Sequence, residues 1–294
     1  MTSQPPEDFD VFWKATIEET RSVPLHFHRS PAYGVASDHQ VDRIEFLATG
    51  GRTLKGWIAY PRGARRLPGF LWVAPYGRES VLPNEYGTRE GLVSMSFNFH
   101  GEDGFHRETY EKERGYFAEG AESPETWIFR RMFQDAVIAA KALQAQLEVD
   151  EDRVASMGMS QGGGMSIWLG AWCSLIGAVC ADMPFLGNIG TTLKGKVYRY
   201  PLKELADFIA ELPIGLERVL HTVSYFDTAF HASRCKCPTQ VALGVMDPAA
   251  RPDQVKAIYE ALPGEKRLQE YQIGHDWTPE MVENNRDWLT TYLP

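Results

Sequence analysis

The sequence predicts an α/β protein with a mostly parallel central sheet and helices on both flanks. Short apolar runs alternate with helical stretches along the chain, which is the pattern of parallel strands joined by crossover helices. One of these runs, residues 154–158, enters a glycine-rich turn and continues as an apolar helix. The 294 residues, 44% of them apolar and 23% charged, can bury one substantial core. We therefore expect a single domain over residues 1–294.

The N-terminal residues 1–40 are expected to form an extension on that domain. Aromatic and aliphatic residues recur at helical spacing between residues 6 and 21, which predicts an amphipathic helix with Asp8 as its candidate cap. Residues 24–33 are expected to run extended. Their His26-x-His28 pair has no further metal ligand nearby in the sequence, so we expect no metal site there.

Two alternating runs, residues 41–48 and 54–60, flank Thr49-Gly-Gly-Arg52 and predict an antiparallel hairpin at the sheet edge. Further apolar runs, separated by helical stretches, predict the parallel strands. These runs cover residues 67–74, 92–99, 153–158, 175–182, 239–245 and 267–273. Helices are expected over residues 124–147, 252–262 and 279–293, the first of them lying on the sheet beside the helix that follows residue 160.

An insertion is expected at about residues 185–232. Helical patterns occur there, such as residues 202–212 and 216–221, but no clear strand. In an α/β sheet, an insertion at this point lies over the carboxyl ends of the strands, where ligands bind. We therefore expect a small helical cap above a binding site.

The stretch Gly158-Met-Ser160-Gln-Gly162 has the form of a nucleophile elbow, a tight turn between a strand and a helix. Side chains two residues before or after the serine would clash in such a turn, and glycine at both positions removes the clash. The helix that begins at Gln161 directs its unpaired N–H groups and its positive dipole end toward the serine oxygen. Ser160 is therefore the candidate nucleophile.

A serine hydroxyl needs a base to remove its proton, and the base needs a third group to orient it. In the order typical of α/β-hydrolases, an acid and then a histidine follow the serine, each on a loop after a strand. Asp247 and His275 meet both conditions. The weaker candidates are His100, which precedes the serine, His221 and His231, which lie in the expected cap, and Asp182 as an alternative acid.

Stabilising the oxyanion of an acyl-transfer reaction requires two N–H donors. The first is the backbone N–H of Gln161, directly after the candidate nucleophile. The second comes from the loop after an early strand, which here is Pro75-Tyr76-Gly77. We assign it to the N–H of Tyr76, whose ring is also placed to wall the acyl pocket.

Charge and composition exclude several classes of function. Thirty basic against 39 acidic residues give a net charge of −9, which argues against binding nucleic acid or anionic lipid and favours a small neutral or cationic substrate. The four cysteines form neither a disulfide framework nor a Cys-x-x-Cys site, and no metal or organic cofactor is required. The first eight residues lack an export signal, and small residues interrupt the longest apolar run, residues 167–181. We therefore expect a cytoplasmic protein that does not enter a membrane.

Several further motifs accompany the elbow in a fixed order along nearly the whole chain. They are Asp8-Phe-Asp-Val-Phe-Trp13, Pro75-Tyr76-Gly77, Arg130-Arg131, Gly158-Met-Ser160-Gln-Gly-Gly-Gly164, Ala181-Asp-Met-Pro-Phe185, Ser224-Tyr-Phe-Asp227, Cys237-Pro238, Gly244-Val-Met-Asp247 and Gly274-His275. This set resembles carbohydrate esterase family seven, the acetyl xylan esterases and cephalosporin-C deacetylases.

The resemblance implies an α/β-hydrolase that removes acetyl groups from acetylated xylo-oligosaccharides or from small acetyl esters such as cephalosporin C. Ser160, Asp247 and His275 match the catalytic triad of the family, and Tyr76 and Gln161 match its oxyanion donors. Members of the family are commonly cytoplasmic homo-oligomers, often hexamers with active sites facing a central cavity. The resemblance therefore also implies an oligomer and a small substrate.

Two departures from the family pattern bear on the substrate. Where the family has Arg-Gly-Gln-Gly, this chain has His100-Gly101-Glu102-Asp103-Gly104, so hydrogen bonds there are expected to depend on charge. Where the family has glutamate after the catalytic histidine, this chain has Asp276 and then Trp277. Two alternatives stay open, an α/β-hydrolase for a different small ester or lactone and a degenerate hydrolase that acts as an oligomeric binding protein. The candidate pocket residues are His100, Glu102, Pro184, Phe185 and Trp277.

Overall fold

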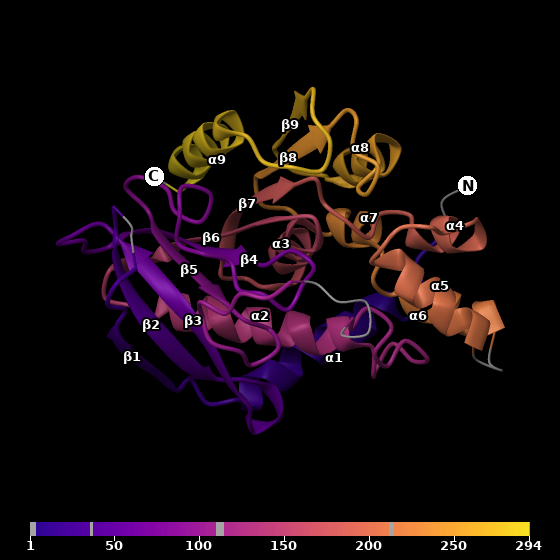
Figure 1. Cartoon of the computed structure of the whole chain (residues 1–294), viewed down its shortest axis with the longest axis horizontal. Coiled ribbons are helices and arrows are strands. Elements are labelled where there is room, and N and C mark those ends of the chain that lie inside the picture. The colour runs from indigo at the N-terminus through magenta and orange to yellow at the C-terminus, as the bar shows by residue number, and fades with distance from the viewer. Residues whose placement is uncertain (1–3, 36–37, 110–114, 212–214, 294) are drawn as a thin grey trace.

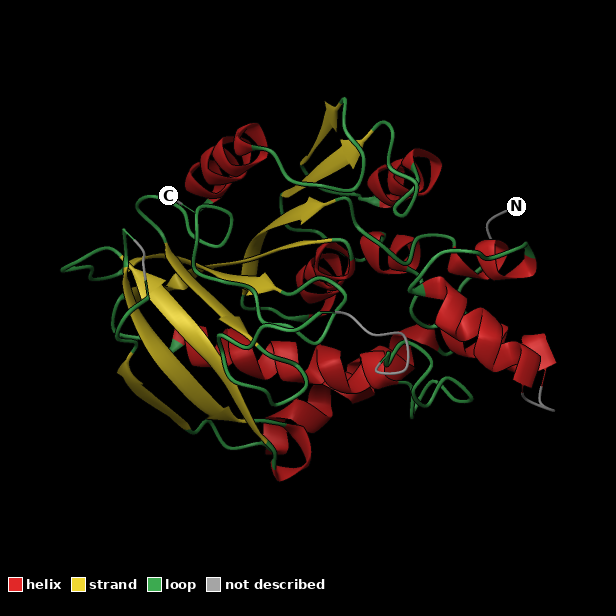
Figure 2. Cartoon of the chain, in the orientation of Figure 1, coloured by secondary structure: helices red, strands yellow, loops and turns green. Residues whose placement is uncertain are grey.

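The computed structural model describes residues 4–35, 38–109, 115–211 and 215–293. The expectations for residues 1–3 and 36–37 of the extension, for 212–214 of the insertion, and for 110–114 and 294 lie outside the described residues. Within them, one twisted sheet runs through the molecule with helices on both sides (Figure 2). The strands are β1 (Phe27–Pro31), β2 (Gln40–Leu47), β3 (Thr53–Tyr60), β4 (Leu67–Val73), β5 (Val93–Phe97), β6 (Val149–Met159), β7 (Ile176–Asp182), β8 (Thr239–Gly244) and β9 (Lys266–Tyr271).

The sheet has the strand order β1-β2-β3-β5-β4-β6-β7-β8-β9 (Figure 1). From β5 to β9 in this order neighbouring strands are parallel, whereas β1, β2, β3 and β5 form antiparallel pairs. The predicted fold class, α/β with a mostly parallel sheet, is confirmed. The helices are α1 (Phe9–Glu19), α2 (Ile128–Gln144), α3 (Gln161–Trp172), α4 (Ile189–Lys194), α5 (Leu202–Glu211), α6 (Gly215–Ser224), α7 (Thr228–Ala232), α8 (Pro252–Ala261) and α9 (Pro279–Tyr292).

The predicted hairpin is present as β2 and β3, but the expectation that it forms the sheet edge was wrong. β1 pairs with β2 along its whole length and is the outermost strand. Arg29 of β1 anchors this strand, because its guanidinium contacts Asp42 at 2.7 Å and Glu148 at 2.8 Å. Those partners lie 13 and 119 residues away along the chain. An ion pair to a residue 119 positions away, together with the pairing to β2, therefore holds this strand at the sheet edge.

The expectation that helices separate all the parallel strands was also wrong at one place. Between β4 and β5 the chain passes through turns and bends without a helix. Pro75 and Pro83 lack the N–H groups that a helix needs, and three glycines in this segment further weaken any helical turn. The segment instead forms a long loop at the carboxyl end of β4.

Alternate residues of the central strands face opposite layers of the molecule. In β4, Leu71 and Val73 belong to the large core cluster that includes residues of α1, α2 and α3. Phe70 and Trp72 belong to a second cluster together with Trp288 of α9. This period of two follows from strand geometry and explains why the strand reads as a continuous apolar run. None of the helices among the described residues is long and apolar enough to cross a lipid bilayer.

The N-terminal helix α1 is joined to a segment more than two hundred residues later. Trp13 is fully buried, and its Nε1 donates a hydrogen bond to the carbonyl oxygen of Tyr225 at 2.8 Å. Asp8 stands at the start of α1, but its carboxylate accepts a hydrogen bond from the Tyr225 hydroxyl at 2.5 Å and none from the helix. The expectation that Asp8 caps α1 was wrong, because the distant hydroxyl takes the carboxylate away from the helix end.

Replacing Trp13 by alanine should lower the free energy of unfolding by about 3–5 kcal/mol, because it empties a buried site and removes one of the two donors, Trp13 Nε1 and His231 Nε2, to the Tyr225 carbonyl oxygen. Urea unfolding followed by circular dichroism measures this change. The control is Val11→Ala on the same helix, where the side chain is 68% exposed and the change should stay within about 0.5 kcal/mol. Equal stability of the two variants would show that α1 is not part of the core.

Candidate active site

Ser160 stands between β6 and α3 in a tight turn. Its backbone has φ 57° and ψ −118°, a region that residues other than glycine rarely adopt. Gly158 and Gly162 permit the turn, because a Cβ atom on either would overlap the carbonyl oxygen of Val73 in β4. The N–H of Ser160 donates to the carbonyl oxygen of Asp182 in β7 at 2.8 Å. Strands β4, β6 and β7 therefore jointly fix the position of Ser160 at the carboxyl edge of the sheet.

Asp247 and His275 are joined by a hydrogen bond on the loops after β8 and β9. His275 Nδ1 donates to Asp247 Oδ2 at 2.6 Å. The other carboxylate oxygen, Oδ1, accepts from the N–H groups of Ala249 at 2.7 Å and Ala250 at 3.0 Å. The Asp247 side chain is fully buried, whereas 27% of the His275 side chain is exposed. A proton on Nδ1 leaves His275 Nε2 as a hydrogen-bond acceptor, the form that a general base requires.

Backbone contacts join the loops after β7, β8 and β9. The N–H of Met183, one residue after β7, donates to the carbonyl oxygen of Ala242 in β8 at 2.9 Å. Gly244, the last residue of β8, lies so close to Gly274 that a Cβ atom would stand 2.6 Å from the Gly274 oxygen. His275 directly follows Gly274, and it therefore lies at the same edge of the sheet as Ser160.

The alternative bases have other partners. His231 is fully buried and accepts a hydrogen bond from Trp172 Nε1 at 2.9 Å, and burial lowers its pKa well below the ordinary value. His221 lies on α6 with its ring against Tyr225. Among the histidines that the structure describes, only His275 bonds to Asp247. His231 is thus part of the buried core, and His221 is an exposed residue of α6.

The alternative acid, Asp182, faces away from His275. Its Oδ2 accepts a hydrogen bond from Asn285 Nδ2 of α9 at 2.8 Å, on the face of the sheet opposite α3. The side chain is almost completely buried, and burial raises the pKa of Asp182 to about 6. Its place in the site is limited to its backbone carbonyl, which holds the N–H of Ser160.

Tyr116, which no sequence pattern singled out, links the loop that carries one candidate oxyanion donor to the side chain of the residue that carries the other. Its hydroxyl accepts a hydrogen bond from the N–H of Gly77 at 3.2 Å and donates one to Gln161 Oε1 at 2.9 Å. Its ring lies 5.0 Å from the ring of Tyr76. Burial raises the pKa of Tyr116, so the hydroxyl keeps its proton. Because its partners lie 39 and 45 residues away in sequence, only the tertiary structure shows this bridge.

Tyr76 also contacts the helices between β7 and β8. Its hydroxyl donates to the carboxylate of Glu204 on α5, and the same carboxylate accepts from the N–H of Phe117 at 2.8 Å. Figure 1 shows α5 beside α6 at one end of the molecule, beyond the sheet. The loop that carries the candidate oxyanion donor is therefore tied to this helical segment.

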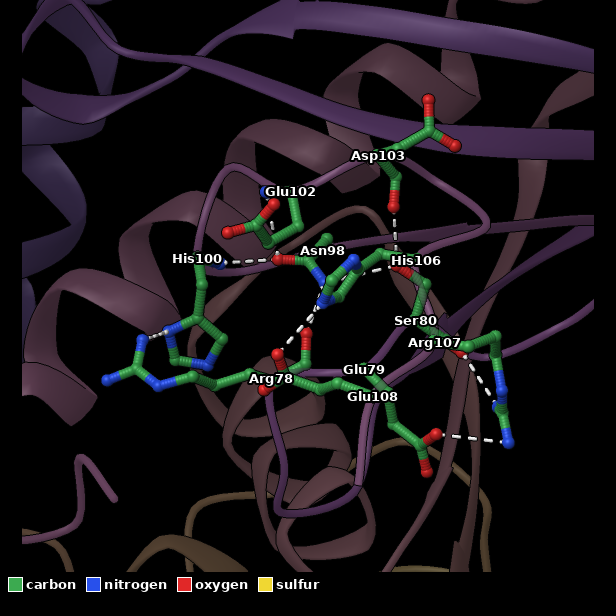
Figure 3. Close-up of polar contacts among 10 residues, drawn as sticks. All are labelled: Arg78, Glu79, Ser80, Asn98, His100, Glu102, Asp103, His106, Arg107 and Glu108. Atoms are coloured by element: carbon green, nitrogen blue, oxygen red, sulfur yellow. Dashed lines mark hydrogen bonds and ion pairs between the residues drawn. The ribbon is translucent and has the colours of Figure 1, made fainter. Parts of the chain in front are cut away.

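The segment from His100 to Gly104 is anchored through its backbone. Asn98 Oδ1 accepts from the N–H groups of His100 at 2.8 Å and Glu102 at 3.3 Å, as Figure 3 shows. Burial and the guanidinium of Arg78 lower the pKa of His100 to about 4, while the side chain of Glu102 is exposed. His100 is therefore neutral near pH 7. Its Nδ1 lies 3.3 Å from Arg78 Nη1, a contact in which a neutral ring accepts, and the expectation that hydrogen bonds in this segment depend on charge stays a prediction.

The other candidate pocket residues are spread over separate places. Trp277 and Tyr76 line one cavity of about 250 Å³. Phe185 lines another, of about 210 Å³, between the segment before α5 and the loop after Asp247. Pro184 is buried against Gly163 of α3. A larger groove of about 980 Å³ opens beside the first residue of β4 and shares Asn84 with the cavity that Trp277 lines.

Comparison with known proteins identifies the family. The model of the acetyl xylan esterase family matches residues 1–292. The chain belongs to the acetyl xylan esterase family. A curated relative, the acetyl esterase Axe7A of Xylanibacter ruminicola, is 22% identical in an alignment 286 residues long that covers 93% of this chain. The match covers 64% of that relative, so the chain spans somewhat less than two thirds of its length.

Solved structures of acetyl xylan esterases share the fold over nearly their whole length. The enzyme from Paenibacillus sp. R4 has a TM-score of 0.88 and 24% identity, covering 99% of this chain and 96% of that chain. Acetyl xylan esterase 1 from Thermoanaerobacterium sp. JW/SL YS485 has a TM-score of 0.83 and 23% identity, covering 100% and 96%. The predicted α/β-hydrolase fold and the resemblance to this family are confirmed.

In this acetyl xylan esterase family member, Tyr116→Phe should lower kcat for a small acetyl ester by about tenfold and change KM less. Loss of a whole oxyanion donor costs about 10²–10³ in kcat, and this variant only loosens the loop and side chain beside two donors. Steady-state kinetics at several ester concentrations measures both constants.

The matched control for this variant is Tyr60→Phe, which removes a buried hydroxyl bonded to Asp42 at 3.0 Å. It should lose stability without a comparable fall in kcat. Equal kinetic effects of the two substitutions would mean that Tyr116 acts only on stability.

Asp182→Asn should raise stability increasingly as pH rises. The folded-state pKa of about 6 exceeds the ordinary 3.8, so the folded protein binds the proton more tightly than the unfolded chain does. The stability that this carboxyl contributes is present below about pH 4 and is lost as pH rises through about 6. The free energy of unfolding of the variant minus that of the parent should therefore increase by up to about 3 kcal/mol from pH 4 to pH 7.5. Urea unfolding at both pH values checks this, and a gap that narrows with pH would contradict it.

Proposed function

We propose that the protein hydrolyses acetyl esters of small carbohydrates through an acyl-enzyme formed on Ser160. The observation that carries the proposal is the pairing of His275 with the buried Asp247 at 2.6 Å, at the same sheet edge as the elbow serine. Membership of the acetyl xylan esterase family supports acetyl as the acyl group. Short acetylated xylo-oligosaccharides and small acetyl esters such as cephalosporin C are the proposed substrates.

The first half of the reaction forms the acyl-enzyme. A hydrogen bond between Ser160 Oγ and His275 Nε2 forms as the substrate binds, because catalytic hydrogen bonds often tighten only in the complex with substrate. His275 then takes the proton as Ser160 Oγ attacks the acetyl carbon, and Asp247 stabilises the imidazolium. His275 returns the proton to the departing sugar oxygen, which leaves the acetyl group on the serine. A water molecule activated by His275 releases acetate in the second half.

The N–H groups of Tyr76 and Gln161 are the proposed donors to the oxyanion. Gln161 is the first residue of α3, whose dipole adds positive potential at this point. The hydroxyl of Tyr116 holds the neighbouring Gly77 and the side chain of Gln161 in place. Donors fixed in this way need little reorganisation when negative charge develops on the carbonyl oxygen.

We propose that residues 1–294 form one domain. An N-terminal extension covers residues 1–40, and a helical cap is inserted at about residues 185–232. Support comes from Glu204 of α5, which bonds to Tyr76, and from Trp13 of α1, which is buried in the common core. We also propose that the protein is a cytoplasmic homo-oligomer, such as a hexamer, and that it acts on small esters and on neither nucleic acid nor membranes. Family kinship, the net charge of −9 and free cysteines typical of reducing compartments support these points.

Ser160→Ala should lower hydrolysis of 4-nitrophenyl acetate by several orders of magnitude, because no other group takes over the attack on the acetyl carbon. Release of 4-nitrophenol measures the rate. A fluorophosphonate probe should add its mass to the parent protein at Ser160 and leave the variant unlabelled.

The control is Ser233→Ala, an exposed serine after α7 that should turn over and label like the parent. Turnover by Ser160→Ala at the parent's rate would remove this serine from the mechanism. Absence of labelling in the parent would favour a binding protein without hydrolase activity.

A further inference from the structure

A cavity of about 250 Å³ lies between the loop after β4 and the loop after β9. Tyr76, the proposed oxyanion donor, lines it from the first loop. Trp277, two residues after His275, lines it from the second. The cavity therefore borders the proposed site of reaction on two sides, and a group bound in it would be adjacent to the acetyl carbon.

One wall of the cavity is aromatic. The ring of Trp277 lies edge-on to Trp72 at 5.5 Å and 82°, and it stacks on Tyr86 at 5.6 Å and 18°. These contacts fix the indole in one orientation. The C–H face of a pyranose ring is apolar and flat enough to pack against such a wall, because burial of apolar surface is favourable.

The other wall carries a pair of opposite charges. Arg107 and Glu79 contact each other at 3.0 Å, as Figure 3 shows, and their side chains are 57% and 43% exposed. The guanidinium only donates hydrogen bonds and the carboxylate only accepts them. Adjacent sugar hydroxyls both donate and accept, so they match this pair. Because the two charges cancel, the wall suits a neutral ligand.

The charged wall is held in place by a buried network. Ser80 is 2% exposed, and its N–H donates to the carbonyl oxygen of His106 at 2.8 Å. The hydroxyl of Ser80 donates to the carbonyl oxygen of Asp103 at 2.7 Å and accepts from Asn98 Nδ2 at 3.1 Å (Figure 3). Glu79 and Arg107 each lie one residue from a member of this network. A pocket fixed before binding loses little entropy when the ligand enters.

We infer that this cavity binds the alcohol half of the ester as a single pyranose ring, with its face on Trp277 and its hydroxyls on Arg107 and Glu79. The inference rests on the proposed function. Pockets for drug-sized ligands enclose about 300–1,000 Å³, so a cavity of about 250 Å³ admits one sugar ring and not an oligosaccharide chain. The enzyme then acts on acetylated monosaccharides or on a terminal residue.

Three acetyl esters separate the parts of this inference. Methyl 3-O-acetyl-β-xylopyranoside presents a ring with hydroxyls, cyclohexyl acetate a ring without them, and ethyl acetate no ring. Arg107→Met should lower kcat/KM for the xyloside about tenfold relative to cyclohexyl acetate, because only the xyloside hydroxyls use the guanidinium. Trp277→Ala should lower kcat/KM for both ring esters about tenfold relative to ethyl acetate.

The control is Tyr33→Ala, which changes a tyrosine that is 90% exposed and outside the cavity. It should leave kcat/KM for all three esters unchanged. Thermal unfolding confirms that each variant folds, and Tyr86→Leu replaces Trp277→Ala if the latter does not. An equal fall in kcat/KM for all three esters in the cavity variants would show that these residues have only a structural role, and it would overturn the inference. So would a parent enzyme that cleaves ethyl acetate without preferring the rings, whereas a parent that cleaves none of the esters would overturn the proposed function itself.

Discussion

The close approach of backbone to backbone at the serine turn is the constraint on which the rest of the structure depends. Gly158 and Gly162 lie against the carbonyl oxygen of Val73, and the N–H of Ser160 is held by the carbonyl oxygen of Asp182. Three neighbouring strands, β4, β6 and β7, therefore end at fixed positions relative to one another. The loops that leave β4 and β7 start from this arrangement, so the candidate oxyanion loop is placed by the same contacts that strain the serine.

A second close approach between backbones fixes the positions of the loops that carry the candidate acid and base. Gly244 of β8 meets the carbonyl oxygen of Gly274, and Met183 bonds to β8 from the end of β7. Asp247 then needs only its own short turn, in which two N–H groups fix one carboxylate oxygen, to present the other to His275. The pairing of acid and base thus results from main-chain packing, and it does not rely on the mobile ends of long side chains.

Local patterns were sufficient to predict the strands of the parallel sheet and the turn at Ser160, and they also propose the candidate triad, which stays a prediction. Each of these depends on residues within one strand and its loop, such as the glycines around Ser160 or Asp247 after an apolar run. The errors have a different origin. At the sheet edge, Arg29 of β1 contacts Glu148. The carboxylate of Asp8 bonds to Tyr225 and not to its own helix. The hydroxyl of Tyr116 bonds to Gly77 and Gln161, which lie about forty residues away. No local pattern reports such contacts, because each is decided by where distant segments meet.

The departures from the family pattern occur where the backbone, not the side chain, carries the structure. Asn98 binds the N–H groups of residues 100 and 102, and any side chain at those positions leaves these bonds intact. This explains how His100 and Glu102 are accommodated without disturbing the loop beside Ser80. His100 packs on Tyr116 as a neutral ring, while Glu102 faces solvent. Trp277 follows the same logic, since its side chain adds a cavity wall next to a loop whose position is set by Gly244 and Gly274. Sequence change at these positions therefore alters what borders the candidate site, while the backbone positions of Ser160, Asp247 and His275 depend on the sheet.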